Sequence, residues 1–293
     1  MTSRVDCSVV VLTLDEEANI GRLLESLEGW AAGIFIVDSG STDRTLEIAR
    51  RFTERIVFHE FTNQAKQFNW ALDNLPITTG WVLRLDADEF LPAELRDEIA
   101  GVLPGLPLDV TGLLVKRRVY FLGRWIRHGG MYPIWMLRLV RRGKGRSEQV
   151  EMDEHLVVLE GRTQRLRHDF VHDDRKGLAA WTAKHEGYAG REARLLRELA
   201  AMPAVDARRG ALAEGQRARK RWLKSNLYAR SPLFLRAFLY FSYRYLLRLG
   251  FLDGREGLAY HVLQGFWYRF YVDAKLWEAR RAGRPQAETG RPS

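Results

Sequence analysis

Short apolar runs alternate with segments of helical spacing through the first half of the chain. The runs are continuous and rich in β-branched residues, which is typical of strands buried on both faces. We expect strands at residues 7–12, 34–37, 55–59 and 81–85, and helices at residues 19–30, 42–52 and 64–75. Strands that alternate with helices predict an α/β fold, in which a mainly parallel sheet carries helices on both faces.

The pattern changes in the second half. Residues 112–120 predict another strand, residues 157–159 and 163–167 predict short antiparallel strands, and residues 178–201 predict an amphipathic helix. Pro203 and Gly210 mark a boundary, beyond which the chain is helical, basic and aromatic. We therefore expect a first domain at residues 1–205, with halves at 1–110 and 111–205, and a helical region at 206–293.

Composition narrows the class of protein. The 293 residues are 46% hydrophobic and 11% aromatic, which is enough for a packed core and excludes general disorder. The single cysteine, Cys7, excludes a disulfide framework and a cysteine-rich zinc module. The first apolar run is too short for a signal peptide, and no stretch of about 20 apolar residues lacks charge. We expect a cytoplasmic protein without a membrane-spanning helix.

The net charge of +9 comes from two blocks. Residues 1–115 carry 9 bases and 19 acids, whereas residues 116–146 carry 10 bases and no acid. Residues 207–250 hold 11 bases and one acid. Such blocks are typical of proteins with anionic partners, which are phosphates, nucleic acid or an anionic membrane, although either block could also be a solvated face.

Three predicted strands end in acidic loops. In α/β sheets of this kind, ligands bind beyond the carboxyl ends of the strands, so these loops are the candidate site. Asp86-Ala87-Asp88 follows the strand at 81–85, and its two carboxylates, at i and i+2, point to one side and could share a divalent cation. Turn formation and helix capping are the alternative explanation for each single loop.

Two further residues suggest contacts with a nucleotide. Asp38 ends a buried strand, where its carboxylate could accept a hydrogen bond from the imide N–H of a uracil or could be satisfied by its own turn. Lys66 begins a predicted helix, where the helix dipole favours phosphate, although an isolated lysine is more often a solvated surface charge.

Together these motifs resemble the inverting family 2 glycosyltransferases, in the branch of the lipopolysaccharide-core β-glucosyltransferases and related capsule enzymes. The resemblance covers nearly the whole chain and implies the GT-A fold, a UDP-sugar donor and a Mg²⁺ or Mn²⁺ cofactor. The stretches that carry it are residues 12–20, 37–43, 66–72, 85–89, 122–130, 138–143 and 250–254.

The resemblance also implies residue roles. Asp88 and Asp86 match the metal and diphosphate motif, while Leu14 and Asp15 depart from the family pattern of an aromatic residue followed by Asn. The residues expected to bind the nucleotide-sugar are Thr13, Leu14, Glu16, Asp38, Ser39, Lys66, Asp86, Ala87 and Asp88. The residues expected to contact the acceptor or a phosphate are Arg127, His128, Arg138 and His172.

An inverting transfer needs a carboxylate to take the proton of the acceptor hydroxyl. The family has a His-Glu pair after the basic segment, and the matching stretch here is Asp153-Glu154. We expect Glu154 to be the base, with Asp153 as the competing choice and a salt-bridged surface glutamate as the alternative.

The C-terminal region predicts attachment to a membrane surface. Residues 231–252 are long and apolar but contain Arg236, Arg244 and Arg248, whose separations of eight and four residues put them on one helical face. This pattern favours a helix that lies in the interface, with the arginines at the headgroups, on the inner face of the cell membrane. Packing of this helix on the catalytic domain is the alternative.

The sequence therefore predicts transfer of a hexose from a UDP-sugar to a cell-envelope glycan or glycolipid, such as lipopolysaccharide core. A nucleic-acid-binding protein is a rival interpretation, suggested by the basic blocks, but no nucleic-acid-binding motif supports it. A nucleotidyltransferase is a second rival, but residues 12–17 lack the glycine-rich phosphate loop that such enzymes carry. We expect no nucleic-acid partner.

Overall fold

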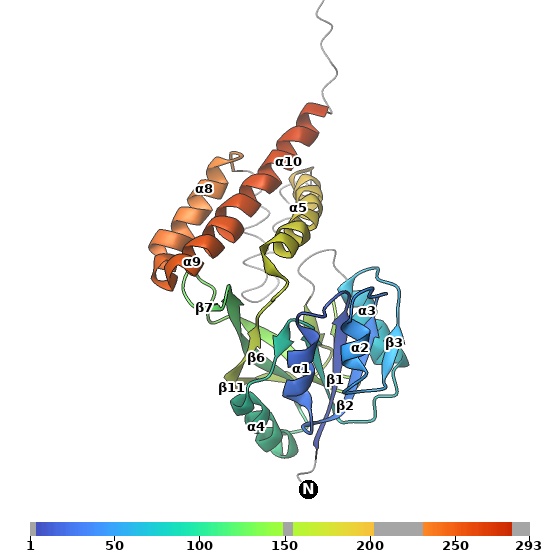
Figure 1. Cartoon of the computed structure of the whole chain (residues 1–293). Coiled ribbons are helices and arrows are strands. Elements are labelled where there is room, and N and C mark those ends of the chain that lie inside the picture. Colours follow the sequence, from blue (N-terminus) through green and yellow to red (C-terminus); the bar gives the residue numbers. More distant parts are fainter. Residues whose placement is uncertain (1–3, 149–154, 202–230, 283–293) are drawn as a thin grey trace, which may run out of the picture. The chain divides into compact units, whose positions relative to one another are not determined.

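The computed structural model describes residues 4–148, 155–201 and 231–282 (Figure 1). The chain divides into two compact units, residues 1–177 and residues 178–293. The first unit contains the sheet, and the described part of the second is helical.

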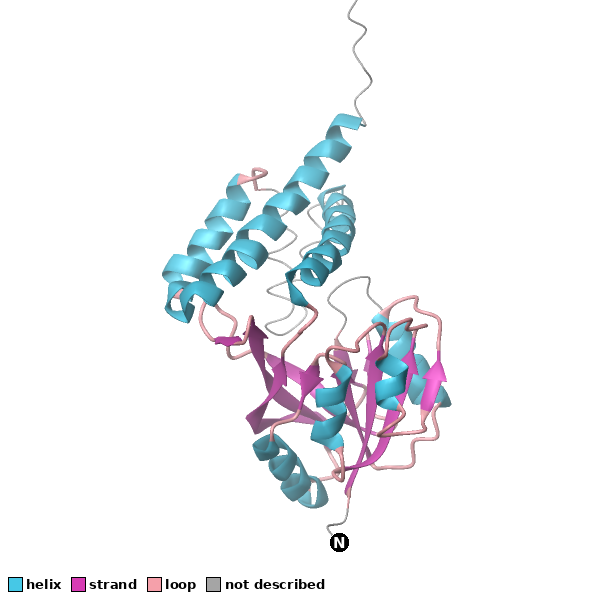
Figure 2. Cartoon of the chain, viewed as in Figure 1, coloured by secondary structure: helices cyan, strands magenta, loops and turns pink. Residues whose placement is uncertain are grey.

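One mixed sheet forms the centre of the first unit, shown in magenta in Figure 2. Its described strands run in the order β3-β2-β1-β4-β8-β6-β11-β5, and β7 pairs with β6. Strands β1, β2, β3 and β4 pair in parallel. Strand β8 pairs antiparallel with both β4 and β6, and so joins these four strands to the rest of the sheet. The strand bounds are β1 Val5–Thr13, β2 Ala31–Asp38, β3 Ile56–Phe58, β4 Trp81–Asp86, β5 Glu89–Phe90, β6 Val110–Phe121, β7 Arg124–Ile126, β8 Trp135–Arg141 and β11 Arg162–His172.

Helices cover both faces of this sheet, as the sequence predicts. In β1, Val9 and Val11 point into one hydrophobic cluster while Val10 and Leu12 point into the other, because successive side chains of a strand alternate. The first cluster packs against α1 (Ile20–Leu27), α2 (Thr45–Ala49), α4 (Ala93–Val102) and the short helix η1 (Leu103–Gly105). The second packs against α3 (Gln64–Asn74). The expected α/β fold, with helices on both faces of the sheet and a helical C-terminal region, is confirmed.

The strand expected at residues 163–167 is one difference from the prediction. The structure replaces the short antiparallel strand expected at residues 163–167 with β11, which is eleven residues long and runs parallel to β6. The sequence hides this strand because Asp169 interrupts its apolar pattern. Asp169 is buried and is neutralised by Lys116 at 3.0 Å and Arg118 at 2.8 Å. The strand near residues 157–159 is β10 (Leu156–Val158), which pairs antiparallel with β9 (Gly145–Ser147) as expected.

The second unit is built from helices. Ala189, Ala193 and Leu196 of α5 pack against Tyr268 and Val272 of α10. The structural division therefore precedes the boundary expected near residue 205, because α5 shares its core with the C-terminal helices. The bounds are α5 Gly177–Ala201, α8 Leu235–Ser242, η3 Tyr243–Leu247, η4 Gly250–Asp253, α9 Gly254–Tyr260, η5 His261–Trp267 and α10 Tyr268–Ala282.

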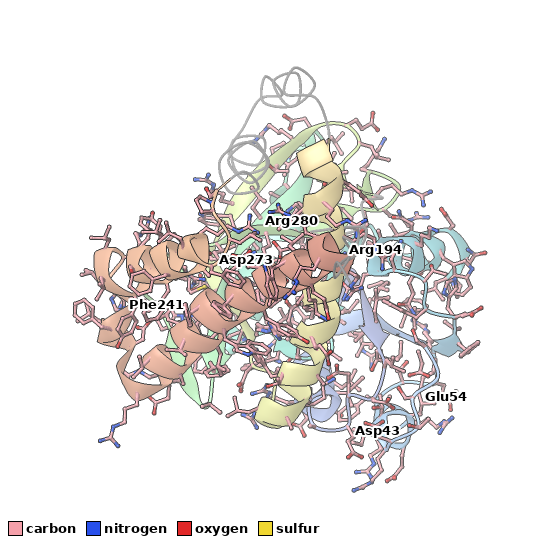
Figure 3. All side chains as sticks on the ribbon, turned by 90° about the horizontal axis from the view of Figure 1, so that it is seen from above. Asp43, Glu54, Arg194, Phe241, Asp273 and Arg280 are labelled. Atoms are coloured by element: carbon pink, nitrogen blue, oxygen red, sulfur yellow. The ribbon has the colours of Figure 1, made fainter. Side chains whose placement is uncertain are left out.

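The expected helix at residues 231–252 is broken, and its arginines do not share an exposed face. The chain turns at Leu249, which has a left-handed φ of 60°. Arg236 and Arg244 are buried, and only Arg248 is exposed. The prediction that all three face outward is wrong, because Arg236 forms a buried ion pair with Asp273 of α10, labelled in Figure 3. None of the helices in the described residues has the length and apolarity needed to cross a membrane.

Candidate functional site

The sheet register brings three acidic loops to one edge. The last residue of β1, Thr13, pairs with Asp38 of β2, and Leu12 pairs with Asp86 of β4. Because β1, β2 and β4 are parallel, their carboxyl ends point the same way. The prediction that separate strands deliver carboxylates to one edge is confirmed for Asp38 and Asp86.

Asp88 lies beside a histidine from a distant strand. The Nδ1 atom of His172, at the end of β11, is 3.3 Å from Oδ1 of Asp88. The backbone N–H of Asp173 donates to the Asp88 carbonyl at 2.9 Å, which ties the two segments together. Burial opposes protonation of His172, but the neighbouring Asp88 outweighs it, so the pKa of this imidazole is raised.

Asp86 lies between two buried arginines. The guanidinium of Arg138 is 3.6 Å from this carboxylate and that of Arg84 is 3.8 Å away. Burial disfavours the charged carboxylate, yet Arg138 and then Arg84 hold the pKa of Asp86 below its ordinary value. Arg138 also pairs with Glu89, whose pKa burial raises to about 7. Asp86 is thus ionised and fixed in position.

Glu16 joins the same edge of the sheet from the loop after β1. Its carboxylate accepts hydrogen bonds from Asn19 at 2.8 Å and from Lys176 at 2.5 Å. Burial raises the pKa of Glu16, and repulsion from Asp88 adds to this effect, while Lys176 and Asn19 oppose it. The electrostatic coupling places Glu16 near the carboxylate that the sequence associates with metal binding.

The loops after β1 and β2 fasten each other. The carboxylate of Asp15, a residue with a φ of 52°, accepts a hydrogen bond from the backbone N–H of Thr42 at 2.7 Å. The backbone N–H of Asp15 in turn donates to the hydroxyl of Ser41. Asp38 accepts from the N–H groups of Gly40 and Ser41 and from the Ser41 hydroxyl. The alternative left open by the sequence, a carboxylate satisfied by its own turn, is therefore what the structure shows for Asp38.

The other residues that the sequence predicts to bind the nucleotide-sugar lie around these two loops. Thr13 is buried, and its hydroxyl has no hydrogen-bond partner among the described residues. Leu14 is 45% exposed, whereas Ala87 is buried. Ser39 accepts a hydrogen bond from Gln67 of α3 at 2.7 Å, which brings the start of that helix to the loop. Lys66, the residue before Gln67 in α3, is exposed and lines an open hollow of about 460 Å³.

The expected acceptor residues separate into two groups. Arg127 is exposed beyond β7, with its guanidinium 5.5 Å from the centre of the Trp125 ring, and His128 follows it. Arg138 is only 4% exposed and lies against Asp86 and Glu89. The prediction that Arg138 contacts the acceptor is therefore corrected: two carboxylates draw its guanidinium inward, where it positions Asp86.

The candidate catalytic pair cannot be placed, because Asp153 and Glu154 lie outside the described residues. The residues that flank them are joined, since the N–H of Glu148 donates to the carbonyl of His155 at 2.8 Å.

The residues at this edge are suited to a divalent cation that keeps water and phosphate ligands. No group of three His, Cys, Asp or Glu side chains able to hold a metal occurs in the part of the chain that the structure describes. Asp88 and His172 nevertheless supply an oxygen and a nitrogen donor side by side, and Oδ1 of Asp86 is buried without a hydrogen-bond partner in the described residues. Mg²⁺ typically binds through one or two carboxylates together with substrate phosphates and water, so the site fits Mg²⁺ or Mn²⁺.

Sequence reasoning missed several residues that build this site. Asn19 is 1% exposed; its amide donates to Glu16 and Asp174 and accepts from the N–H of Arg175. Arg84 donates to Gln64 and Ser147, so it links β4 to α3 and β9. A charged residue inside an otherwise apolar strand, as in Trp-Val-Leu-Arg-Leu, was the available signal for Arg84.

Comparison with known proteins identifies the family. Residues 8–155 match Glycosyl transferase family 2, which is half of the chain, so the chain belongs to this family. The lipopolysaccharide core biosynthesis glycosyltransferase LpsC of Rhizobium meliloti is 32% identical over 172 residues, which cover 57% of this chain and 62% of LpsC. A PGL/p-HBAD biosynthesis glycosyltransferase of Mycobacterium tuberculosis is 36% identical over 140 residues, covering 43% of this chain and 52% of the relative.

Two solved structures are similar to this chain. Glucosyl-3-phosphoglycerate synthase from Mycobacterium tuberculosis, in complex with Mg²⁺ and UDP, has 25% identity and a TM-score of 0.32, over 40% of this chain and 44% of the other. TarS 1–349 of S. aureus, in complex with UDP-GlcNAc, has 17% identity and a TM-score of 0.44, over 96% and 93% of the two chains.

Proposed function

We propose that this chain is a metal-dependent inverting glycosyltransferase that transfers a hexose from a UDP-sugar to a glycan or glycolipid of the cell envelope, such as lipopolysaccharide core. The observation that carries the proposal is the meeting of Thr13, Asp38 and Asp86 at one sheet edge, with Asp88 beside His172. Family membership and the likeness to LpsC support the reaction and the acceptor class. The absence of glycine at residues 12–17 argues against a nucleotidyltransferase.

The donor lies across the loops after β1 and β2. The hydroxyl of Thr13, which has no hydrogen-bond partner among the described residues, and the exposed side chain of Leu14 contact the nucleoside, with Glu16, Asp38 and Ser39 beside it. Because the two loops hold each other through Asp15 and Ser41, the nucleotide meets a surface that is already ordered. Lys66 approaches the phosphates from the start of α3.

Asp88 would hold the cation, with His172 beside the Asp88 carboxylate and Asp86 fixed in position by Arg138. A bound Mg²⁺ or Mn²⁺ neutralises charge on the departing diphosphate. The chain's own contribution is to keep Asp86 ionised through Arg138 and Arg84, so that the edge stays anionic before the metal arrives.

Glu154 takes the proton of the acceptor hydroxyl as that oxygen attacks the anomeric carbon, and Asp153 is the competing base. The support for this assignment is the family pattern, in which a Glu follows the basic segment. Arg127 and His128 contact the acceptor or its phosphates.

We further propose that the enzyme works in the cytoplasm, peripherally on the inner face of the cell membrane, and that nucleic acid is not a partner. Residues 207–230 carry eight bases and one acid, and each base near an anionic surface adds about 1 kcal/mol to binding. Flotation with anionic liposomes tests the association, and high salt should release much of the protein. Retention on heparin without UDP binding would instead favour a nucleic-acid partner.

Screening UDP-, GDP- and dTDP-sugars tests the activity. With Mg²⁺ or Mn²⁺ present, UDP-sugars should raise the melting temperature most and should be hydrolysed slowly in the absence of an acceptor. Stabilisation by GDP- or dTDP-sugars alone would overturn the donor assignment, and full transfer in excess EDTA would overturn the metal assignment.

A further inference from the structure

Seven residues of the helical unit expose five large apolar side chains. This apolar turn, residues 246–252, links η3 to η4. Its exposed side chains and their exposed fractions are Leu246 55%, Leu247 76%, Leu249 46%, Phe251 44% and Leu252 50%. Surface hydrophobic residues that occur singly are ordinary, but a continuous group marks an interaction surface.

The backbone of the apolar turn is built to point these side chains outward. A side chain at Gly250 would come within 2.6 Å of Nε2 of His261, so only glycine fits there. Asp253 is buried while its neighbours Phe251 and Leu252 are exposed. The Gly-Phe-Leu-Asp-Gly stretch thus turns its polar residue inward and its apolar residues outward, which is the reverse of a turn made for water.

The exposed charges at the turn are positive. Arg248 lies within the turn and Arg255 lies just beyond it, and both are exposed. The nearby acids are less accessible, since Asp253 is buried and Glu256 is partly buried. The sequence that precedes α8 is also basic, with eight bases and one acid at residues 207–230.

We propose that the apolar turn inserts into the acyl boundary of an anionic bilayer, with Arg248 and Arg255 at the level of the headgroups. The inference rests on the membrane association proposed above and names the contact that produces it. Apolar side chains beneath a rim of arginines are the arrangement by which proteins bind one leaflet without spanning it. The inserting element is therefore a turn, and Arg236 and Arg244 stay inside the protein.

A second copy of the chain is a poorer occupant for this surface. A two-fold dimer places each surface against itself, so Arg248 and Arg255 of one copy would approach the same residues of the other. The exposed cations find no exposed acid in this stretch to compensate them. An anionic bilayer supplies both the apolar layer and the opposite charge.

Site-specific labelling tests the insertion in the full chain. Cys7, the single cysteine, is fully buried, and burial raises the pKa of its thiol, so it reacts poorly and can be replaced by serine. Leu247→Cys and Phe251→Cys then carry a polarity-sensitive fluorophore. Leu108→Cys is the matched control, because this leucine of the first unit is 87% exposed.

With vesicles of phosphatidylcholine and phosphatidylglycerol, labels at 247 and 251 should shift to the blue and be quenched by doxyl lipids. The label at 108 should remain in water. In unlabelled protein, Leu247→Asp and Phe251→Asp should each weaken vesicle partition at least about tenfold, because a charge replaces a buried apolar group. Leu108→Asp should leave partition unchanged, and all three variants should hydrolyse UDP-sugars as the parent does.

The outcomes separate this inference from the proposed function. If the protein floats with vesicles while the labels at 247 and 251 stay in water, the basic segment alone binds and the insertion is overturned. A blue shift that needs no vesicles and grows with protein concentration shows a second copy on the turn, which also overturns it. Absence of flotation overturns both membrane proposals. If the parent protein does not hydrolyse UDP-sugars although the labels insert into the bilayer, only the enzymatic assignment is overturned.

Discussion

At the scale of single residues, the two aspartates of Asp86-Ala87-Asp88 have different surroundings. Asp86 is held by Arg138 and Arg84, whereas Asp88 faces His172. The structure therefore predicts different losses for the two. Asp88→Asn should lower transfer at least about 100-fold, because a donor to the leaving group's cation is lost, while the melting temperature changes little. Steady-state transfer and thermal unfolding measure the two effects.

Asp86→Asn is the matched comparison at the same motif. It leaves two buried guanidinium groups with less neutralising charge, and breaking such a buried pair costs about 3 kcal/mol. This variant should lose stability as well as activity. Equal stability of both variants would contradict the separate roles given to Asp86 and Asp88.

The base is tested at Glu154. Glu154→Gln should slow the chemical step strongly while UDP binding is retained, because the nucleotide contacts lie on other loops. Single-turnover transfer and calorimetry with UDP separate the two steps. If Asp153→Asn is inactive and Glu154→Gln is active, the neighbour is the base.

At the scale of elements, the regular part of the fold follows from the sequence. Continuous apolar runs predict the strands that meet at the candidate site, since both faces of β1 are buried. The failures occur where a charge is buried with a partner from a distant segment. Asp169 with Lys116 obscures β11, and Arg236 with Asp273 reverses the face of α8. The local pattern of apolar and polar residues contains no information about such partners. A charged residue of a buried ion pair is therefore predicted to be exposed.

The pair of Arg236 and Asp273 gives a prediction for α8. Asp273 is fully buried and also accepts from the N–H of Phe234 at 2.7 Å. Asp273→Leu should cost about 3–5 kcal/mol because it removes the buried carboxylate that pairs with the Arg236 guanidinium. The double variant Arg236→Met with Asp273→Leu should recover much of that loss. Denaturant unfolding of both variants measures the difference. If the double variant regains no stability, the guanidinium of Arg236 is in contact with water.

The burial of His261 predicts that the stability of the helical unit depends on pH. This side chain is buried, and desolvation with help from Arg244 lowers its pKa to about 4. The unfolded chain takes up a proton near the ordinary pKa of 6.5, whereas the folded chain does so only near 4. Stability should therefore fall as pH falls from about 6.5 to about 4, by at most about 3 kcal/mol.

His261→Phe is the control for this effect, since neither ring nitrogen has a hydrogen-bond partner in the described residues. The variant should unfold with a weaker pH dependence between pH 6.5 and 4. The free energy of unfolding at several pH values, compared with the parent, measures the difference. Parallel curves would show that another group causes the loss.

At the scale of the whole molecule, the net charge of +9 overstates the number of basic side chains that are available to bind anions. In the block at residues 116–146, Lys116 and Arg118 neutralise Asp169, Arg138 neutralises Glu89, and Arg146 pairs with Asp73. Much of that block therefore stabilises the fold. Arg127 and Arg142 of this block are exposed, and Arg127 is the residue that we propose for contact with the acceptor.

The division of the chain provides the last prediction. The donor residues from Thr13 to His172 all belong to the first unit, whereas Ala189, Ala193 and Leu196 of α5 are covered by α10. A chain ending at residue 177 should fold and bind UDP within about threefold of the parent, but it should not float with anionic vesicles. A chain ending at residue 205 keeps α5 without its partner helix and should aggregate, because the apolar stripe is exposed. Calorimetry with UDP, flotation and light scattering compare the two. If the shorter chain aggregates and the longer one is stable, α5 belongs to the catalytic unit and the boundary near residue 205 is the right one.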